Sequence, residues 1–226
     1  MPCYRTNVMH VSRTLAIACC LIPLVVSVAS AQTPERSPTE GLKETERFIK
    51  AGGSTSGSVA SARVEVEKTL TAYNNLVTQP SKNMKSDYKK LLKSMDSMNK
   101  KVTDATTKIA AMQSAADTYF AGRSGTIKTI QDPVLHKQAQ ERMEQSQKDF
   151  GDVLALLRQA GGALDPFRKQ LADQIKFLGS DLNPSATASL KPQADRLNAD
   201  GAAVFSGTDQ AISKSNAYFD GLKSQS

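Results

Sequence analysis

Few residues of this chain have side chains suited to catalysis or metal binding. The three cysteines and one of the two histidines lie within the first 31 residues: Cys3, Cys19, Cys20 and His10. If that segment is removed, no thiol remains, and the common structural zinc sites cannot be built from His136 alone. A Ser-His-Asp arrangement would need His136, which follows Asp132-Pro133 at the expected start of a helix. Because such a histidine is typically solvated, we expect no catalytic residue, no metal site and no cofactor.

Carboxylates and a glycine-rich stretch are the other candidates for chemistry. Acid–base or metal sites made only of carboxylates would use Asp149, Asp152 and Asp165, or Glu141 and Glu144. Their spacing fits exposed helix faces, so we assign them no role. The glycine-rich residues 52–57 lack the Gly-Lys-Ser/Thr ending of a phosphate loop, and no strand precedes them. The sequence therefore predicts that the protein is not an enzyme.

Basic residues are concentrated between Ser81 and Met112, where eight lysines face only three acidic residues. The lysines are Lys82, Lys85, Lys89, Lys90, Lys93, Lys100, Lys101 and Lys108. A basic helix attracts anionic lipid, lipopolysaccharide, cell-wall polymer or nucleic acid. The alternative is a solvated face that keeps a coiled coil soluble. Nucleic acid is disfavoured, because Tyr88 and Tyr119 fall on the apolar stripe of the same helix instead of between the lysines.

That apolar stripe has the period of a coiled-coil seam. Its members are alternately four and three residues apart: Met84, Tyr88, Leu91, Met95, Met98, Val102, Ala105, Ile109, Met112, Ala116 and Tyr119. At ~1.5 Å per residue the run is a rod of roughly 54 Å, and residues 139–178 repeat its period as the expected partner. The four methionines are typical of core filler. Alternatively, they form a flexible surface for unfolded clients.

The other patterns are helical as well, and none alternates as a β-strand would. We expect a flexible N-terminal segment over 32–57 containing a short helix near 41–51, followed by a bundle over 58–222. Its helices are predicted at 58–78, 82–121, 133–178 with a kink near Pro166, and 184–221. The fold class is thus all-α, an elongated antiparallel coiled-coil-like bundle of three to four long helices. The helices bury their apolar stripes either against one another within one chain or against a second copy of the chain in a homo-oligomer.

The first 31 residues have the features of a signal peptide. Arg5 and Arg13 accompany an apolar run over 15–28, and Ala29-Ser30-Ala31 is a small-x-small cleavage site. We expect cleavage after Ala31 and a periplasmic or secreted mature chain without a transmembrane span. An uncleaved membrane anchor, or lipidation at Cys19 or Cys20, is the alternative. Losing two arginines lowers the 29 basic residues to 27 against 22 acidic ones, a net charge of +5.

Three segments carry a resemblance to a known family: LDPF at 164–167, DQIKFL at 173–178 and DLNPSATASL at 181–190. They resemble a signature of an uncharacterised bacterial family of exported or lipoprotein-like coiled-coil proteins, classed as a domain of unknown function. The likeness is closest over about 150–220. It implies a helical fold and an envelope location, and it brings no known active site. The lysine-rich second helix and the lack of tryptophan depart from the family pattern.

Together these observations predict a non-enzymatic cell-envelope protein that acts as a scaffold or interaction module. Its partners would be other envelope proteins or anionic envelope polymers. The alternative functions are a periplasmic binder of anionic polymers or lipids, through the lysines, and a holdase-type chaperone, through the methionine seam.

Overall fold

The computed structural model describes residues 38–224 of the 226, and this part of the chain is entirely helical apart from short connections. The expected signal peptide, residues 1–31, lies outside the described residues. The helices are α1 (Pro38–Thr78), α2 (Met84–Lys128), α3 (Pro133–Ser180), α4 (Pro184–Ser189) and α5 (Lys191–Lys223). The all-α prediction is confirmed.

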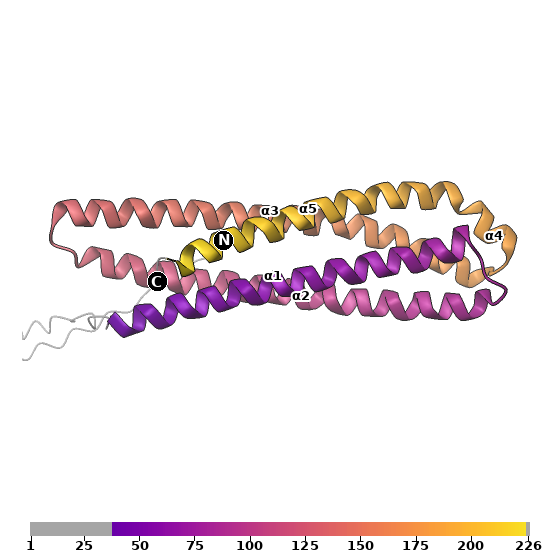
Figure 1. The fold of residues 1–226 in the computed structure, drawn as a ribbon, viewed down its shortest axis with the longest axis horizontal. Coiled ribbons are helices and arrows are strands. Elements are labelled where there is room, and N and C mark those ends of the chain that lie inside the picture. The colour runs from indigo at the N-terminus through magenta and orange to yellow at the C-terminus, as the bar shows by residue number, and fades with distance from the viewer. Residues whose placement is uncertain (1–37, 225–226) are drawn as a thin grey trace, which may run out of the picture. The chain divides into compact units, whose positions relative to one another are not determined.

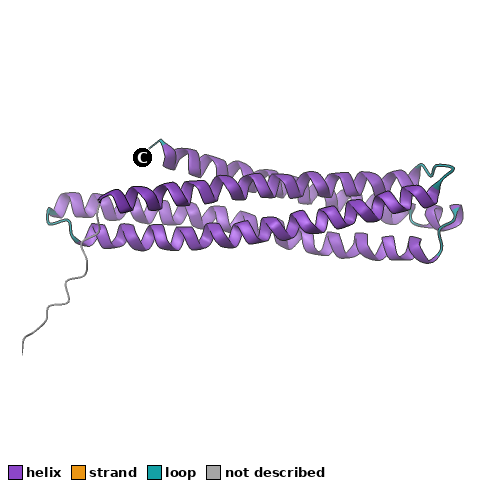
Figure 2. Ribbon diagram, turned by 90° about the horizontal axis from the view of Figure 1, so that it is seen from below, coloured by secondary structure: helices purple, strands orange, loops and turns teal. Residues whose placement is uncertain are grey.

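The four long helices lie side by side along one axis and alternate in direction (Figures 1 and 2). The α1–α2 turn and the short helix α4 lie at one end, and the α2–α3 turn lies at the other. α1 packs most extensively on α2, while α5 packs on both α3 and α1, and the α2–α3 contact is smaller. The expected pairing of the α2 seam with residues 139–178 is therefore only partly right, because α1 is its main partner.

Helix α1 shows that the sequence-based prediction for residues 52–57 is wrong. Residues 52–57 were predicted to be a flexible break, yet α1 runs through them as one helix of 41 residues. The small side chains let neighbouring helices approach closely. A Cβ on Gly52 would overlap the ring of Phe219 on α5, and the hydroxyl of Thr55 lies 2.9 Å from the carbonyl oxygen of Lys108 on α2. Tertiary packing thus overrides the weak helix propensity of glycine and serine.

The ends of α2 and α3 follow cap chemistry. Asn83 caps α2, and its side chain accepts a hydrogen bond from the Ser86 amide at 3.1 Å. α2 also continues seven residues past its predicted end at 121. Asp132 caps α3 as its position before proline predicts, accepting from the amides of residues 134 and 135. α3 continues through Pro166 as a single helix; the kink stays a prediction.

The fourth predicted helix, 184–221, is divided at Leu190 into α4 and α5. Asn183 caps α4, and its side chain accepts a hydrogen bond from the Ala186 amide at 2.8 Å. The division has a local cause in Pro192, which has no amide hydrogen to donate to Ala188 and whose ring crowds that carbonyl. Pro192 therefore starts a new helix instead of continuing the old one.

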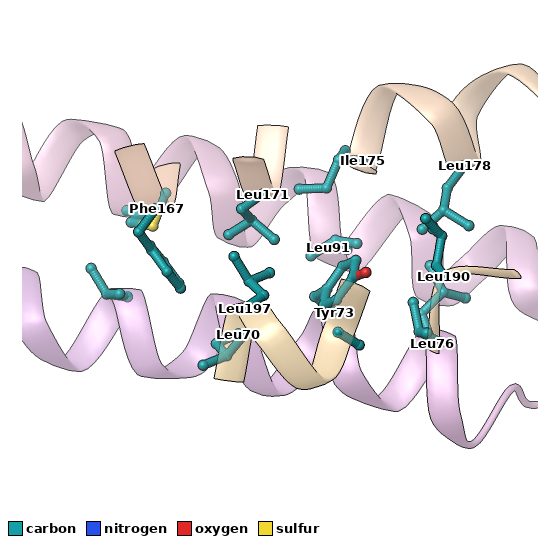
Figure 3. Packing of buried hydrophobic residues seen from close by; sticks show 14 of the residues in the cluster. Leu70, Tyr73, Leu76, Leu91, Phe167, Leu171, Ile175, Leu178, Leu190 and Leu197 are labelled. Atoms are coloured by element: carbon teal, nitrogen blue, oxygen red, sulfur yellow. The ribbon is translucent and has the colours of Figure 1, made fainter. Parts of the chain in front are cut away.

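Side chains from the long helices form two hydrophobic clusters, one in each half of the bundle. The buried residues of the cluster nearer α4 include Leu91 and Leu197 (Figure 3) and are leucine, isoleucine, valine, alanine and methionine apart from Tyr73 and Phe167; Tyr88 and Phe205 pack against it half-buried. The other is built around six aromatic rings: Phe48, Tyr119, Phe120, Phe150, Tyr218 and Phe219. All four long helices contribute to each cluster, so the clusters hold the helix faces in fixed orientations.

The predicted seam of α2 faces this interior. Leu91, Met98 and Met112 have no exposed surface. Ala105, Ala116 and Tyr119 are buried as well. The remaining seam positions are half-buried against the clusters: Met84, Tyr88, Met95, Val102 and Ile109. The period therefore identified the inward face of α2 correctly, and it leaves the opposite face to the lysines.

Candidate functional site

The carboxylates considered for catalysis lie on outward helix faces and interact with neighbours one turn away. Asp149 accepts from Gln145 at 3.0 Å and Glu144 from Gln140 at 2.8 Å. The ion pairs of the other three are Lys148–Asp152 at 3.5 Å, Arg168–Asp165 at 3.5 Å and Lys137–Glu141 at 3.9 Å. Such pairs support helices by ~0.2–0.5 kcal/mol each.

No metal-binding group of three or more histidine, cysteine or acidic residues is found between residues 38 and 224. His136 is half-buried in the first turn of α3, where its backbone amide donates to the Asp132 carbonyl. The same stretch of chain contains no helix with the length and hydropathy of a membrane span.

The lysines of α2 form the most distinctive surface. Lys82, in the turn before α2, and Lys85, Lys89, Lys93 and Lys100 on the helix are all exposed. At about 100° per residue the four helical lysines fall within about 80° of one another and roughly opposite the buried seam, and Lys82 lies in the turn that leads into them. We call these five residues the lysine face. From Lys85 to Lys100 it extends ~22 Å along the outer side of the helix.

None of the five residues of the lysine face makes an ion pair within the described residues. Asp96 is the acidic residue on this side of the helix, and it is exposed. The two other acidic residues of the stretch are engaged elsewhere: Asp87 with Ser81 and Lys90, and Asp104 with Ser58 on α1. Hydrogen bonds from Ser81 and then Lys90 lower the pKa of Asp87.

The remaining three lysines of the predicted set differ from the lysine face. Lys90 forms an ion pair with Asp87 at 3.0 Å. Lys101 is exposed on the flank of the helix, and Lys108 is half-buried beside α1, where its carbonyl accepts from Thr55. The structure thus narrows the eight predicted lysines to five that share one outward face and lack an acidic partner.

Two tyrosines, the buried Tyr73 and the half-buried Tyr218, make the bundle less stable at alkaline pH. Burial raises the pKa of Tyr73 to about 12 and, as its main cause, that of Tyr218 to about 12, from an ordinary value near 10. A raised folded-state pKa means that the unfolded chain loses its proton first. The stabilisation is therefore complete below pH ~10 and is lost as pH rises toward about 12.

We accordingly expect the free energy of unfolding to fall between pH 10 and pH 12. A protein carrying Tyr73→Phe and Tyr218→Phe should show a shallower fall, measured by urea titrations followed by circular dichroism at several pH values. The lysines titrate in the same way in the unmodified protein and in the variant, so their effect on the free energy of unfolding cancels when the two are compared. Parallel loss of stability in the two proteins would exclude the tyrosines as its source.

One family model matches residues 37–222, and its description is Protein of unknown function (DUF2959). The chain belongs to this family. The predicted resemblance to an uncharacterised family is confirmed, and the DUF2959 match extends well beyond residues 150–220 to include nearly all of the five helices. No curated protein and no solved structure matches the chain.

This DUF2959 chain has a cavity at the middle of the bundle that the sequence does not predict. Its walls include the small residues Ala105 on α2 and Ala160 and Gly161 on α3. The heptad spacing places Ala105 on the seam of α2, but only the pairing of the helices shows that Ala160 lies at the same level.

Proposed function

We propose that this protein is a non-enzymatic, exported cell-envelope bundle that acts as an interaction module, binding an anionic surface through the lysine face of α2. The observation that carries the proposal is the group of five exposed lysines on one helix side, without acidic partners in the described residues. The rest of the bundle would serve as the scaffold that holds this face outward.

The physical basis is long-range attraction and counterion release. A lysine beside a carboxylate attracts an external anion less, because the opposite charge cancels much of its long-range field. Unpaired lysines near an anionic membrane surface contribute about 1 kcal/mol each, and the attraction falls off within a Debye length. The lysine face therefore supports binding that depends strongly on salt. A holdase function would need the bundle to open, because Met98 and Met112 are fully buried.

Binding to phospholipid vesicles tests this function. We expect the purified protein to co-sediment with vesicles containing phosphatidylglycerol at low salt. It should bind weakly to pure phosphatidylcholine, and it should be released well above ~0.15 M salt. Replacing Lys82, Lys85, Lys89 and Lys93 with glutamine should weaken binding roughly 10²–10³-fold. Asp96→Asn should strengthen it.

A charge-matched control uses lysines at the other end of the bundle. Glutamine at Lys43, Lys50, Lys137 and Lys148 changes the net charge equally but leaves the lysine face intact, so it should reduce binding far less. Equal losses in the two quadruple variants would mean that only net charge matters. Absence of vesicle binding by the unmodified protein at low salt would refute the lipid form of the proposal.

A further inference from the structure

A cavity of about 70 Å³ lies at the middle of the bundle, between the two hydrophobic clusters. All four long helices contribute to its wall, through residues such as Val59, Ala105, Ala160 and Val204. It exists because Ala105, Ala160 and Gly161 present little or no side chain at this level. The layers on either side instead contain Met98, Met112 and other large side chains.

The wall of the cavity offers few free hydrogen-bonding groups. The hydroxyls of Thr106 and Thr208 donate to carbonyls of their own helices, at 3.0 and 2.7 Å. The guanidinium of Arg63 lies 2.6 Å from the carboxylate of Asp209 and 2.9 Å from that of Glu67, and its buried Nε makes no well-directed hydrogen bond. A buried water needs about two to four polar partners, and this wall offers too few. The favourable occupant is therefore apolar.

The cavity approaches the surface between α2 and α3. Thr106 on α2 and Gly161 on α3 belong to its wall and are both exposed. α3 is also weakest here, because Gly161 and Gly162 have low helix propensity and Pro166 cannot donate to the carbonyl of Gly162. The α2–α3 side of the cavity is therefore the easiest to displace. The contact between α2 and α3 is also smaller than the α1–α2 and α3–α5 contacts.

We propose that this cavity is a binding site for the end of an unbranched aliphatic chain, such as an acyl chain, that enters between α2 and α3. The space is about half that of an engineered ~150 Å³ cavity that takes benzene, so an alkyl end fits better than a ring. All four long helices contribute to its wall, so the site lies inside the bundle, below the surface formed by α2 and α3. A long, thin group reaches that depth, whereas a short branched side chain of a protein partner does not.

Methyl NMR with 1-hexanol tests the proposal. Because this probe is uncharged, the lysine face contributes nothing to its binding, and the result is independent of the proposed function. We expect saturable shifts in the methyl signals of Val59, Val66 and Leu164. The methyls of Leu76 and Leu190 should not move; Leu76 lies 17 residues from Val59 along α1, which is ~25 Å. No saturable shift at the cavity methyls would overturn the proposal.

Cavity-filling variants decide whether the probe binds in this space. Ala160→Leu should abolish the saturable shifts, whereas Ala155→Leu, the same change at an exposed position of α3, should preserve them. Val204→Ile adds a single methylene and should weaken binding at least tenfold, which keeps the test available if Ala160→Leu does not fold. Unchanged shifts in both filling variants would place the alcohol elsewhere and refute the proposal.

Discussion

Replacing Phe48 with alanine is expected to lower the free energy of unfolding by about 3–5 kcal/mol. Phe48 has no exposed surface, and its ring lies within 6.1 Å, centroid to centroid, of all five other rings of its cluster. The substitution removes aromatic contacts to the three other long helices at once. Because stacked and edge-to-face pairs add ~0.5–1.5 kcal/mol each beyond burial, we expect a cost near the upper end.

Urea unfolding followed by circular dichroism measures this effect, and Leu42→Ala supplies the control. Leu42 lies on the same helix but is 56% exposed, so its truncation should change stability by no more than ~0.5 kcal/mol. If α1 before residue 58 were a loosely attached segment, the two substitutions would cost similarly little. That result would contradict the packed N-terminal half of α1.

Adjacent glycines of α1 should respond to alanine with opposite signs. At Gly53 a Cβ meets nothing within 4 Å, so Gly53→Ala should stabilise the helix by about 0.5–1 kcal/mol. At Gly52 a Cβ would overlap the Phe219 ring, which is itself packed against Phe48 and Tyr218 with centroids 5.0 Å away in each case. Since that ring has no room to retreat, Gly52→Ala should destabilise the protein by about 1–3 kcal/mol.

The midpoints of denaturant unfolding for the two glycine variants provide the measurement. A flexible linker over 52–57 would make both substitutions nearly neutral, whereas a packed helix requires opposite shifts. Two stabilising substitutions would show that α5 does not lie against Gly52.

Helix type and several boundaries can be predicted from local chemistry. The four-three spacing from Met84 to Tyr119 identifies the buried side of α2, and Asp132-Pro133 and Asn183-Pro184 mark where α3 and α4 begin. Residues 52–57 could not be read in the same way, because small residues signal either flexibility or close packing. The neighbour that decides between them, Phe219, is more than 160 positions away in sequence.

The candidate site was predicted in part. The sequence supplies all eight lysines and their helical spacing, but which lysines lack partners depends on rotamers and neighbouring helices. Lys90 forms an ion pair with Asp87, and Asp104 accepts a hydrogen bond from Ser58 on α1. The cavity was missed for a related reason, since its walls meet only after α1 and α5 have been placed beside α2 and α3.

The length of α1 sets the distance between Pro38 and the lysine face. The chain enters the described bundle at Pro38, and the lysine face begins just after the far end of the same helix (Figure 1). A helix of 41 residues holds these two points about 60 Å apart. Because α1 packs against α2 and α5, it cannot bend freely, and this distance is fixed. Adding or deleting one heptad in all four long helices together would change its length in steps of ~10 Å while leaving both ends chemically unaltered.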